Sequence, residues 1–197
     1  MSHSKRETAL VLIKPDGVQC GLIGEIISRF ERVGLKLTAL KLIFATAKQG
    51  FEHYKKDDVW FEKVGKRAME EKKLAGKKIE KTAIEYGKEK QKALVDFITS
   101  GPMVAMVWQG NNVCGIVRKL VGGTEPLTSD VGTIRGDFTV DSYHLADADI
   151  RSIRNIIHSS EDTAEAEREI KIWFKEDEIL KYDLIVEKIL YDLDLLK

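Results

Sequence analysis

One histidine of this chain has neighbours that could make it reactive. His158 follows the apolar pair Ile156 and Ile157, and two hydroxyl residues, Ser159 and Ser160, come directly after it. The apolar pair favours a strand, so we expect His158 at a strand end, where a side chain is held rigidly and can face a cleft. The motif alone does not separate a catalytic histidine from a buried, hydrogen-bonded one, which is the more common role.

Four further side chains could bind phosphate, and each is expected near the end of a secondary-structure element. Arginine supplies paired donors, lysine a point charge and a hydroxyl a neutral donor, a combination that suits a polyphosphate. Taken singly, each charged residue is more typical of an exposed side chain or a surface ion pair. The sequence contains neither a Walker pattern nor G-x-G-x-x-G, so side chains rather than a glycine-rich loop would hold the phosphate. The four residues are Lys14, Arg118, Thr124 and Arg135.

The elements that must position these residues follow from hydrophobic periodicity. Their order, β-α-β-(α)-β-α-β, predicts one α+β domain over residues 1–197, with helices covering an antiparallel sheet. Pro15-Asp16-Gly17 is expected to form a turn, and a loop is expected from 122 to 137. We expect strands over 8–14, 35–45, 103–108 and 138–140 and around His158, and helices over 22–33, 48–54, 112–121, 143–151 and 163–174.

Two segments lie outside this pattern. Residues 57–93 are rich in lysine and helix formers, which favours a solvated helical insertion over the alternative of a basic contact surface. In the C-terminal extension, residues 176–197, the apolar residues have helical spacing and the opposite face is acidic. This pattern predicts a helix that packs against this subunit or a neighbour rather than a membrane anchor. Its stripe consists of Val186, Ile189, Leu190, Leu193 and Leu196.

Composition limits the class of protein. Lys+Arg and Asp+Glu both number 32, so the net charge is zero and nucleic acid is not an expected partner. No run of 18 apolar residues predicts a membrane span, and the N-terminus lacks the apolar core of a signal peptide. Cys20 and Cys114 are too few for a disulfide framework and too far apart to indicate zinc. We therefore expect a soluble, cytoplasmic protein.

Taken together, the motifs resemble those of the nucleoside diphosphate kinase family. Its three signature segments are matched, in the family's order, by residues 13–18 (IKPDGV), 132–137 (GTIRGD) and 155–160 (NIIHSS). Residues 100–106 (SGPMVAM) also resemble the family's third strand. The resemblance covers about residues 7–175 apart from insertions, and three such segments together are very specific. It implies a ferredoxin-like βαββαβ sandwich and a homo-oligomer, either a hexamer or a smaller assembly of dimers.

The resemblance also implies a reaction. His158 would take the γ-phosphate of a nucleoside triphosphate as phosphohistidine and pass it to a nucleoside diphosphate, which predicts ping-pong kinetics. Mg²⁺ would arrive on the nucleotide phosphates, with no metal site formed by the protein. The implied roles are phosphate binding for Lys14, Arg118, Thr124 and Arg135; contacts to the sugar hydroxyls for Lys14 and Asn155; a place beside the phosphate for Tyr54; and fixing of the imidazole for Ser160 and Glu169.

The sequence departs from the family pattern at four places. The insertion falls where the family has a phenylalanine that stacks on the base; Trp60 and Phe61 are the candidates here, and Trp60 is the expected base-binding residue. The stretch from Asp137 to Asn155 is also longer than in the short form of the family. Glu125 stands where asparagine is common, and Ser159 where glycine or alanine is common. None of these changes removes a catalytic group. Two alternatives remain: a nucleotide-binding scaffold or regulatory protein of the same fold with weak catalysis, and a nucleic-acid binder that uses the insertion.

Overall fold

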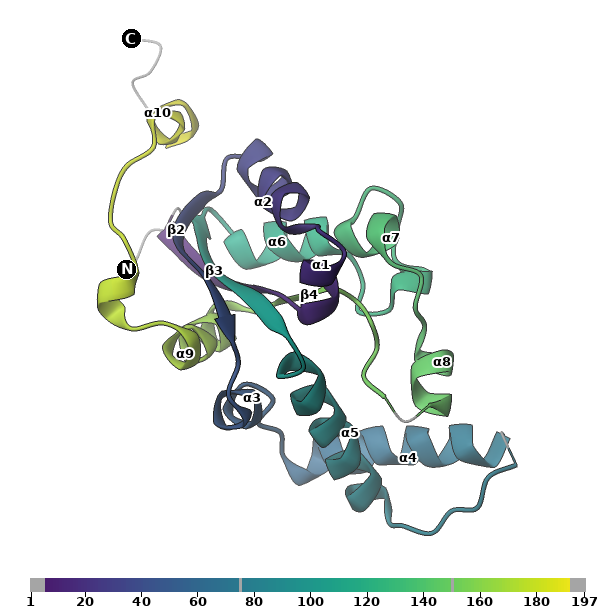
Figure 1. Cartoon of the computed structure of the whole chain (residues 1–197). Coiled ribbons are helices and arrows are strands. Elements are labelled where there is room, and N and C mark those ends of the chain that lie inside the picture. The colour runs from purple at the N-terminus through teal and green to yellow at the C-terminus, as the bar shows by residue number, and fades with distance from the viewer. Residues whose placement is uncertain (1–5, 75, 150, 192–197) are drawn as a thin grey trace.

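A four-stranded antiparallel sheet organises the chain (Figure 1), and its strands lie in the order β2-β3-β1-β4. The computed structural model describes residues 6–74, 76–149 and 151–191. The strands are β1 (Glu7–Ile13), β2 (Lys36–Phe44), β3 (Pro102–Gly110) and β4 (Ile157–Ser159). The predicted α+β fold, a ferredoxin-like sandwich, is confirmed.

Two layers of helices cover the sheet because its central strands are apolar on both faces. Residues 9–13 of β1 and 105–108 of β3 have no exposed surface, as expected for strands buried on both sides. The helices α2 (Ile23–Arg32) and α6 (Val113–Val121) lie on one face, and α3 (Ala47–His53) and α9 (Thr163–Trp173) lie on the other (Figure 1). Asp162 caps α9 by accepting a hydrogen bond from the Glu165 amide at 2.8 Å.

Three local predictions are wrong. Pro15-Asp16-Gly17 is not an isolated turn but opens a short helix, α1 (Pro15–Gln19), since proline suits the first helical position. The strand expected over 138–140 is absent from the described structure. A helix, α7 (Ile134–Phe138), ends there instead, and the Thr133 hydroxyl caps its start by accepting from the Gly136 amide at 3.1 Å. Helical structure therefore also occupies the segment predicted as a loop, where α7 follows a short 3-10 helix, η2 (Pro126–Thr128).

The insertion forms a hairpin of two helices, α4 (Asp58–Leu74) and α5 (Ala83–Ile98), which projects from the sheet layer (Figure 1). Two glycines allow these helices to touch. A Cβ atom on Gly65 would lie 1.7 Å from the Ala83 carbonyl oxygen, and one on Gly87 would lie 2.2 Å from that of Phe61. The helix α8 (Tyr143–Ala148) packs against α4 and occupies the other segment that is longer than in short relatives. The predicted helical insertion is confirmed.

The C-terminal extension runs past the edge strand β2. It contains a 3-10 helix, η3 (Glu176–Glu178), and then α10 (Ile185–Tyr191), which confirms the predicted C-terminal helix. The apolar stripe of α10 packs into this subunit only in part, since Val186 is half-buried whereas Ile189 is 61% exposed. Leu193 and Leu196 lie outside the described residues. Within the described part of the chain, no helix combines the length and apolar character that crossing a bilayer requires.

Candidate active site

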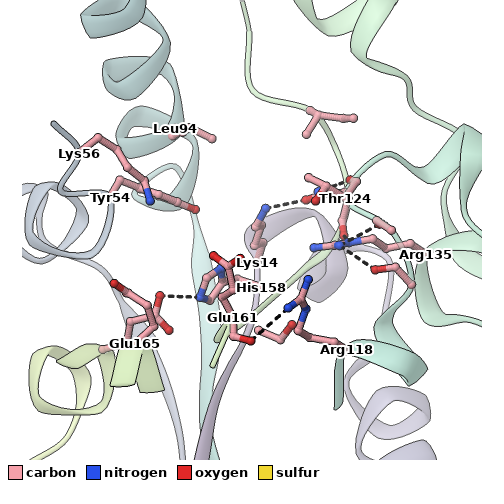
Figure 2. A pocket seen from close by; sticks show the side chains of 16 residues that line it. Lys14, Tyr54, Lys56, Leu94, Arg118, Thr124, Arg135, His158, Glu161 and Glu165 are labelled. Carbon is pink, nitrogen blue, oxygen red and sulfur yellow. Dashed lines mark hydrogen bonds and ion pairs between the residues drawn. The ribbon is translucent and has the colours of Figure 1, made fainter. Parts of the chain in front are cut away.

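The motif residues meet at one open cavity of about 420 Å³ (Figure 2). They come from the end of β1, the C-terminal half of α6 with the loop after it, α7, and the segment that leads into β4. The cavity brings together most of the residues singled out in the sequence. Those that line it are Lys14, Tyr54, Arg118, Thr124, Arg135, Asn155, His158 and Glu169.

His158 is held by a carboxylate from α9. Its Nε2 lies 2.9 Å from Glu169 Oε1, and Ser160 Oγ donates to Glu169 Oε2 at 2.7 Å. Since an ionised carboxylate can only accept, Nε2 carries the proton and Nδ1 keeps its lone pair. Ser160 thus acts on the imidazole through Glu169 rather than by direct contact. Its own Oγ accepts from the Leu10 amide at 3.1 Å, which ties the pair to β1.

The Glu169 carboxyl is poised to remain ionised. Burial alone would raise its pKa, but the hydrogen bond and charge of His158, the hydrogen bond from Ser160 and the charge of Arg168 together lower it below the ordinary value. A charged acceptor therefore stands behind the imidazole at neutral pH, where it orients the ring and would stabilise positive charge that develops on it.

The backbone that leads to His158 is strained. Ile156 has φ = 55°, an unusual value for a β-branched residue, and the Ile157 amide donates to the Asn155 carbonyl at 2.6 Å, which closes a three-residue γ-turn. The 14–17 segment holds this turn in place. The Lys14 amide donates to the Ile156 carbonyl at 2.8 Å, and Asp16 Oδ2 accepts from the Ile156 amide at 3.0 Å. Gly17 lies against the turn and leaves room for it.

Lys14 is a buried cation at the floor of the cavity. Its Nζ donates to Asn155 Oδ1 at 2.6 Å, and the side-chain amide of Asn155 donates to the Thr124 carbonyl at 2.7 Å. Burial, with a contribution from the charge of Arg135, lowers the Lys14 pKa to about 7. In the site without a ligand, the charge of Asp16 raises the Lys14 pKa too little to offset burial and Arg135. The amine is therefore partly neutral near pH 7.

Arg135 is buried beside Lys14 and braces the loops around the cavity. Its guanidinium donates to the carbonyls of Gly122, Gly123, Asn155 and Ile157 at 2.7–3.3 Å. Because a guanidinium has five N–H groups, one remains without an acceptor among the described residues. Burial lowers the Arg135 pKa to about 10, with the charges of nearby tyrosines and Asp16 opposing it, so the side chain stays cationic at neutral pH.

Arg118 and Tyr54 stand at opposite sides of the cavity (Figure 2). Arg118 NH1 donates to the Glu161 carbonyl at 3.1 Å, which aims the guanidinium along the cavity wall. Tyr54 is buried at the end of α3, and burial raises the pKa of its phenol above the ordinary value, so the hydroxyl remains a neutral donor. The site therefore presents two arginines, a lysine and a phenol around one imidazole.

Ser160, which holds Glu169, does not line this cavity, and neither does Trp60. Trp60 lines a neighbouring cavity of about 460 Å³ between α4, α5 and α8, which shares Lys56, Leu94, Thr124 and Ile153 with the first. Phe61, the other aromatic candidate, is buried against α5 and is 8% exposed.

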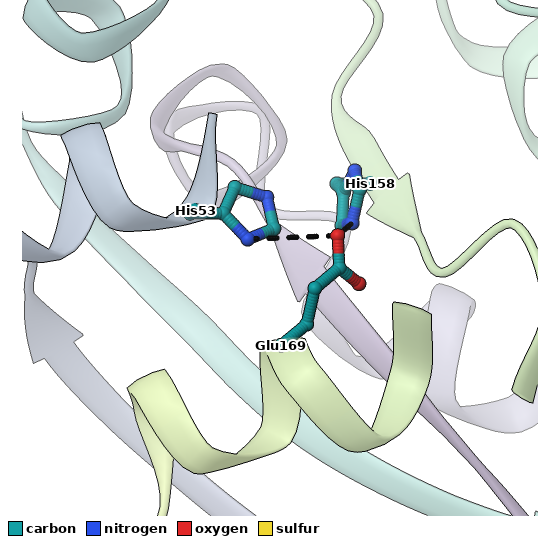
Figure 3. A group of neighbouring side chains, drawn as sticks. All are labelled: His53, His158 and Glu169. Atoms are coloured by element: carbon teal, nitrogen blue, oxygen red, sulfur yellow. Dashed lines mark hydrogen bonds and ion pairs between the residues drawn. The ribbon is translucent and has the colours of Figure 1, made fainter. Parts of the chain in front are cut away.

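The sequence interpretation missed His53, which packs against His158, and Trp173, which contacts His53. His53, the last residue of α3, turns a ring edge toward the face of the His158 ring (Figure 3), with centroids 4.4 Å apart and planes at 82°. Trp173, the last residue of α9, donates from Nε1 to His53 Nδ1 at 3.3 Å. His53 directly precedes Tyr54, but a histidine in the last turn of a helix is common and gave no signal of its own.

A metal ion fits this cluster poorly. His53, His158 and Glu169 do form a group of described side chains whose ligand atoms lie within 4.8 Å of one another. However, the Trp173 N–H already occupies the lone pair of His53 Nδ1, the nitrogen nearer to Glu169. Lys14 and Arg118 line the adjoining cavity, and Arg168 NH2 lies 3.9 Å from Glu169 Oε1, so the local charge favours an anion. The same charges make the cavity suitable for phosphate.

Comparisons with known proteins agree with this geometry. A family model described as nucleoside diphosphate kinase matches residues 7–72 and 60–179. The nucleoside diphosphate kinase of Pyrobaculum aerophilum is 42% identical over 182 residues, which cover 89% of this chain and 98% of that protein. That of Acaryochloris marina is 38% identical over 190 residues, or 94% of this chain and 99% of that protein.

Solved structures give the same result. The crystal structure of the Pyrobaculum aerophilum NDP kinase is similar with a TM-score of 0.83 at 40% identity, covering 89% of this chain and 100% of that one. A Borrelia burgdorferi nucleoside-diphosphate kinase, solved as a transition-state mimic with bound vanadate and ADP, has a TM-score of 0.79 at 36% identity. That match covers 95% of this chain and 98% of the other.

Proposed function

The chain belongs to the nucleoside diphosphate kinase family, and we propose that it transfers the γ-phosphate of a nucleoside triphosphate to a nucleoside diphosphate through a phosphohistidine at His158. The observation that carries this proposal is the fixed imidazole: Glu169 accepts from Nε2 at 2.9 Å, so the lone pair of Nδ1 is free at a cavity lined by Lys14, Arg118 and Arg135. A neutral imidazole with a free lone pair attacks phosphorus without a separate base.

The proposed transfer consists of two successive displacements at the γ-phosphorus. In the first, the Nδ1 lone pair forms an N–P bond while the bond between the γ-phosphorus and the β,γ-bridging oxygen breaks, and the nucleoside diphosphate leaves. The Nε2 proton stays in its hydrogen bond to Glu169, whose negative charge offsets the positive charge on the ring. In the second, a terminal oxygen of another nucleoside diphosphate attacks the same phosphorus and Nδ1 regains its lone pair. The result is ping-pong kinetics.

Electrostatics accounts for most of the rate in this proposal. Charge spreads over the equatorial oxygens of the transferred phosphoryl group, and fixed donors that need no reorganisation stabilise it. We assign phosphate contacts to Lys14, Arg118, Thr124 and Arg135, and sugar-hydroxyl contacts to Lys14 and Asn155. Tyr54 stands beside the phosphate as a neutral donor. In this assignment Ser160 acts as a positioning residue, because it holds Glu169 and not the substrate.

We assign the base to the neighbouring cavity, with Trp60 as the stacking residue. This cavity is continuous with the phosphate site through Lys56, Leu94, Thr124 and Ile153, and Trp60 is a planar side chain in its wall. Stacking on a π-face without reading the hydrogen-bonding edge accepts many bases. This assignment gives the insertion a part in substrate binding.

We propose that a divalent ion, Mg²⁺, enters with the nucleotide. The cations that line the floor of the cavity are not ligands for Mg²⁺, which prefers phosphate and carboxylate oxygens and water. When bound, the ion neutralises charge between the β- and γ-phosphates. Lys14, Arg118 and Arg135 would hold the phosphate oxygens that the ion leaves free.

We also propose that the chain assembles into a homo-oligomer, a hexamer or a smaller assembly of dimers, with the free edge of the sheet as one interface. The edge strand β2 exposes Leu40, Leu42 and Phe44 on one face, and Phe44 is 72% exposed. An apolar edge strand is a template for pairing with another chain. The C-terminal extension contacts β2 from Lys36 to Lys41, and within this stretch the Leu180 amide donates to the Thr38 carbonyl at 2.9 Å and Glu178 pairs with Lys41 at 2.8 Å. The exposed Leu42 and Phe44 lie beyond these contacts, at the end of the strand.

Labelling tests the proposed intermediate. Incubation with γ-labelled ATP and Mg²⁺ is expected to put close to one acid-labile, alkali-stable phosphate on each chain, and a nucleoside diphosphate should remove it. His158→Ala should carry no label, whereas the exposed control His144→Ala should label fully. Equal labelling of His158→Ala would refute the proposal, and binding of nucleotide with no labelling of the wild type would favour the scaffold alternative.

A further inference from the structure

His53 is a buried histidine that the proposed reaction does not use. It is 2% exposed, it does not line the phosphate cavity, and its ring packs edge-on against His158 (Figure 3). Its Nε2 is buried without a hydrogen-bond partner among the described residues. A buried polar atom left without a hydrogen bond is unfavourable, so the position of His53 beside His158 requires a physical reason.

The neighbour of His53 decides where its proton lies. Indole Nε1 can only donate, so His53 Nδ1 must accept from Trp173 at 3.3 Å. Burial, with the charges of His158, Arg168, Lys14 and Lys56 acting in the same direction, lowers the His53 pKa well below its ordinary value, so the ring is neutral. A neutral imidazole whose Nδ1 accepts carries its proton on Nε2, which is the nitrogen without a partner.

The other tautomer of His53 would disturb Glu169. His53 Nδ1 lies 3.7 Å from Glu169 Oε1, the same oxygen that accepts from His158 Nε2 at 2.9 Å. The second oxygen, Oε2, is already taken by Ser160. A proton on His53 Nδ1 would lie in the direction that the Trp173 N–H now occupies. Without that indole donor, a small rotation of the His53 ring would bring the proton to the carboxylate oxygen that fixes His158, which lies 3.7 Å from Nδ1.

We propose that Trp173 and His53 are positioning residues that set the tautomer of His158. By donating to His53 Nδ1, Trp173 keeps that nitrogen unprotonated, so that His53 does not compete with His158 Nε2 for Glu169 Oε1. His158 then holds its proton on Nε2 and presents Nδ1 to the phosphorus. The inference rests on the proposed role of His158. It adds that an indole behind the nucleophile, rather than only the carboxylate in contact with it, selects the attacking nitrogen.

A double-mutant cycle distinguishes this role from simple packing. Trp173→Phe keeps an aromatic ring and removes the donor. We expect it to lower kcat at least tenfold with KM changed less than twofold, because His53 then competes for Glu169. In a His53→Phe background, which contains no competing donor, the same Trp173→Phe change should lower kcat less than twofold. Trp108→Phe is the matched control, since the buried Trp108 Nε1 has no hydrogen-bond partner in the described structure and its loss removes only volume.

The proposal would be overturned if Trp173→Phe lowered kcat by the same factor in the wild-type and His53→Phe backgrounds. It would also be overturned if Trp108→Phe lowered kcat as much as Trp173→Phe does. A second measurement does not depend on the folding of any variant. In the wild-type protein labelled with ¹⁵N-histidine, long-range ¹H–¹⁵N spectra at pH 7–8 should show both His53 and His158 protonated at Nε2. Protonation of His53 at Nδ1 would also overturn it. If the labelling experiment on His158 fails while these spectra hold, the proposed reaction is wrong and the tautomer assignment stands.

Discussion

At the scale of single residues, the proposed site is an imidazole surrounded by basic side chains, and the charge of one of them depends on the ligand. Lys14 shows this best, because it is buried with an amide as its nearest hydrogen-bond acceptor and its pKa is lowered to about 7. An anionic phosphate at that position would restore the ammonium form. The free site therefore avoids the full cost of a buried unpaired charge, and the ligand brings the missing partner.

This coupling predicts proton uptake on binding. At pH 8.5 free Lys14, with its pKa lowered to about 7, is mostly neutral. We expect a bound diphosphate to return that pKa toward the ordinary 10.5, so binding of ADP should take up about 0.8–1 proton at that group. The uptake should fall toward zero below pH 6, where Lys14 is protonated in both states. Calorimetric titrations in buffers of different ionisation enthalpy measure it directly.

Lys14→Arg is the control for this prediction, since a guanidinium is charged with or without ligand. It should show no uptake at pH 8.5 beyond that of the nucleotide itself. The same uptake in Lys14→Arg as in the wild type would assign the proton to another group.

At the scale of elements, the segment 14–17 and the γ-turn at Ile156 form one unit. Two backbone hydrogen-bonding groups of Ile156 are held by the Lys14 amide and the Asp16 carboxylate. The strain at φ = 55° is thus maintained from a segment about 140 residues away in sequence. Because His158 follows two residues later, the unit sets the height of the imidazole above the phosphate site.

Gly17→Ala tests this unit. A Cβ atom there would lie 2.8 Å from both the Ile156 carbonyl oxygen and Ile13 Cγ2, so the turn must shift. We expect a loss of about 1–3 kcal/mol in the free energy of unfolding and a lower kcat. Gly24→Ala, in the exposed part of α2 with open space around the new methyl group, should instead gain roughly 0.4–1 kcal/mol. Urea unfolding of both variants decides the matter, and equal stabilities would contradict the account.

Sequence reasoning recovers elements better than it recovers their junctions. The dense apolar runs predict β1 and β3, and the helical stripes predict α2, α6 and α9 to within one or two residues. The strand predicted over 138–140 is wrong because the Thr133 cap starts the helix α7, which extends to Phe138. The strand-forming residues of this segment do not outweigh that cap. Pro15 is read wrongly because proline opens a helix as readily as it ends a strand.

The candidate site follows the same division. The charged residues that line the cavity were all singled out in the sequence, except Lys56, Glu161 and Glu165, which belong to no recognised motif. His53 and Trp173 were not identified from the sequence because they interact only through a contact between the ends of α3 and α9. No local sequence pattern predicts that contact. The second cavity also depends on how α4 and α8 pack, which the sequence of either does not specify.

At the scale of the whole molecule, the edge strand β2 carries exposed apolar residues toward its C-terminal end, while the site lies at the opposite end of the strand order. The site is built on β1 and β4, and β2 forms the free edge. Assembly through β2 would therefore leave the cavity open. An interface there also accounts for the apolar residues on this strand, which would otherwise be a liability.

Phe44→Lys tests this interface. A charge at the edge strand should reduce the assembly by at least one step in sedimentation velocity, because burying an unpaired ammonium in an apolar contact costs several kcal/mol. Val59→Lys on α4, where Val59 is 74% exposed, is the matched control and should leave the sedimentation coefficient unchanged. If Phe44→Lys sediments like the wild type, the interface lies elsewhere.

The central claim is that Nδ1 of His158, freed by Glu169, carries the phosphate. The most direct test is NMR of the native phosphoenzyme, prepared with ATP from ¹⁵N-histidine-labelled protein and freed of nucleotide. We predict one phosphohistidine, assigned to residue 158, with the phosphorus coupled to Nδ1 and a proton on Nε2. Phosphorus bonded to Nε2, or to any residue other than His158, would contradict the account.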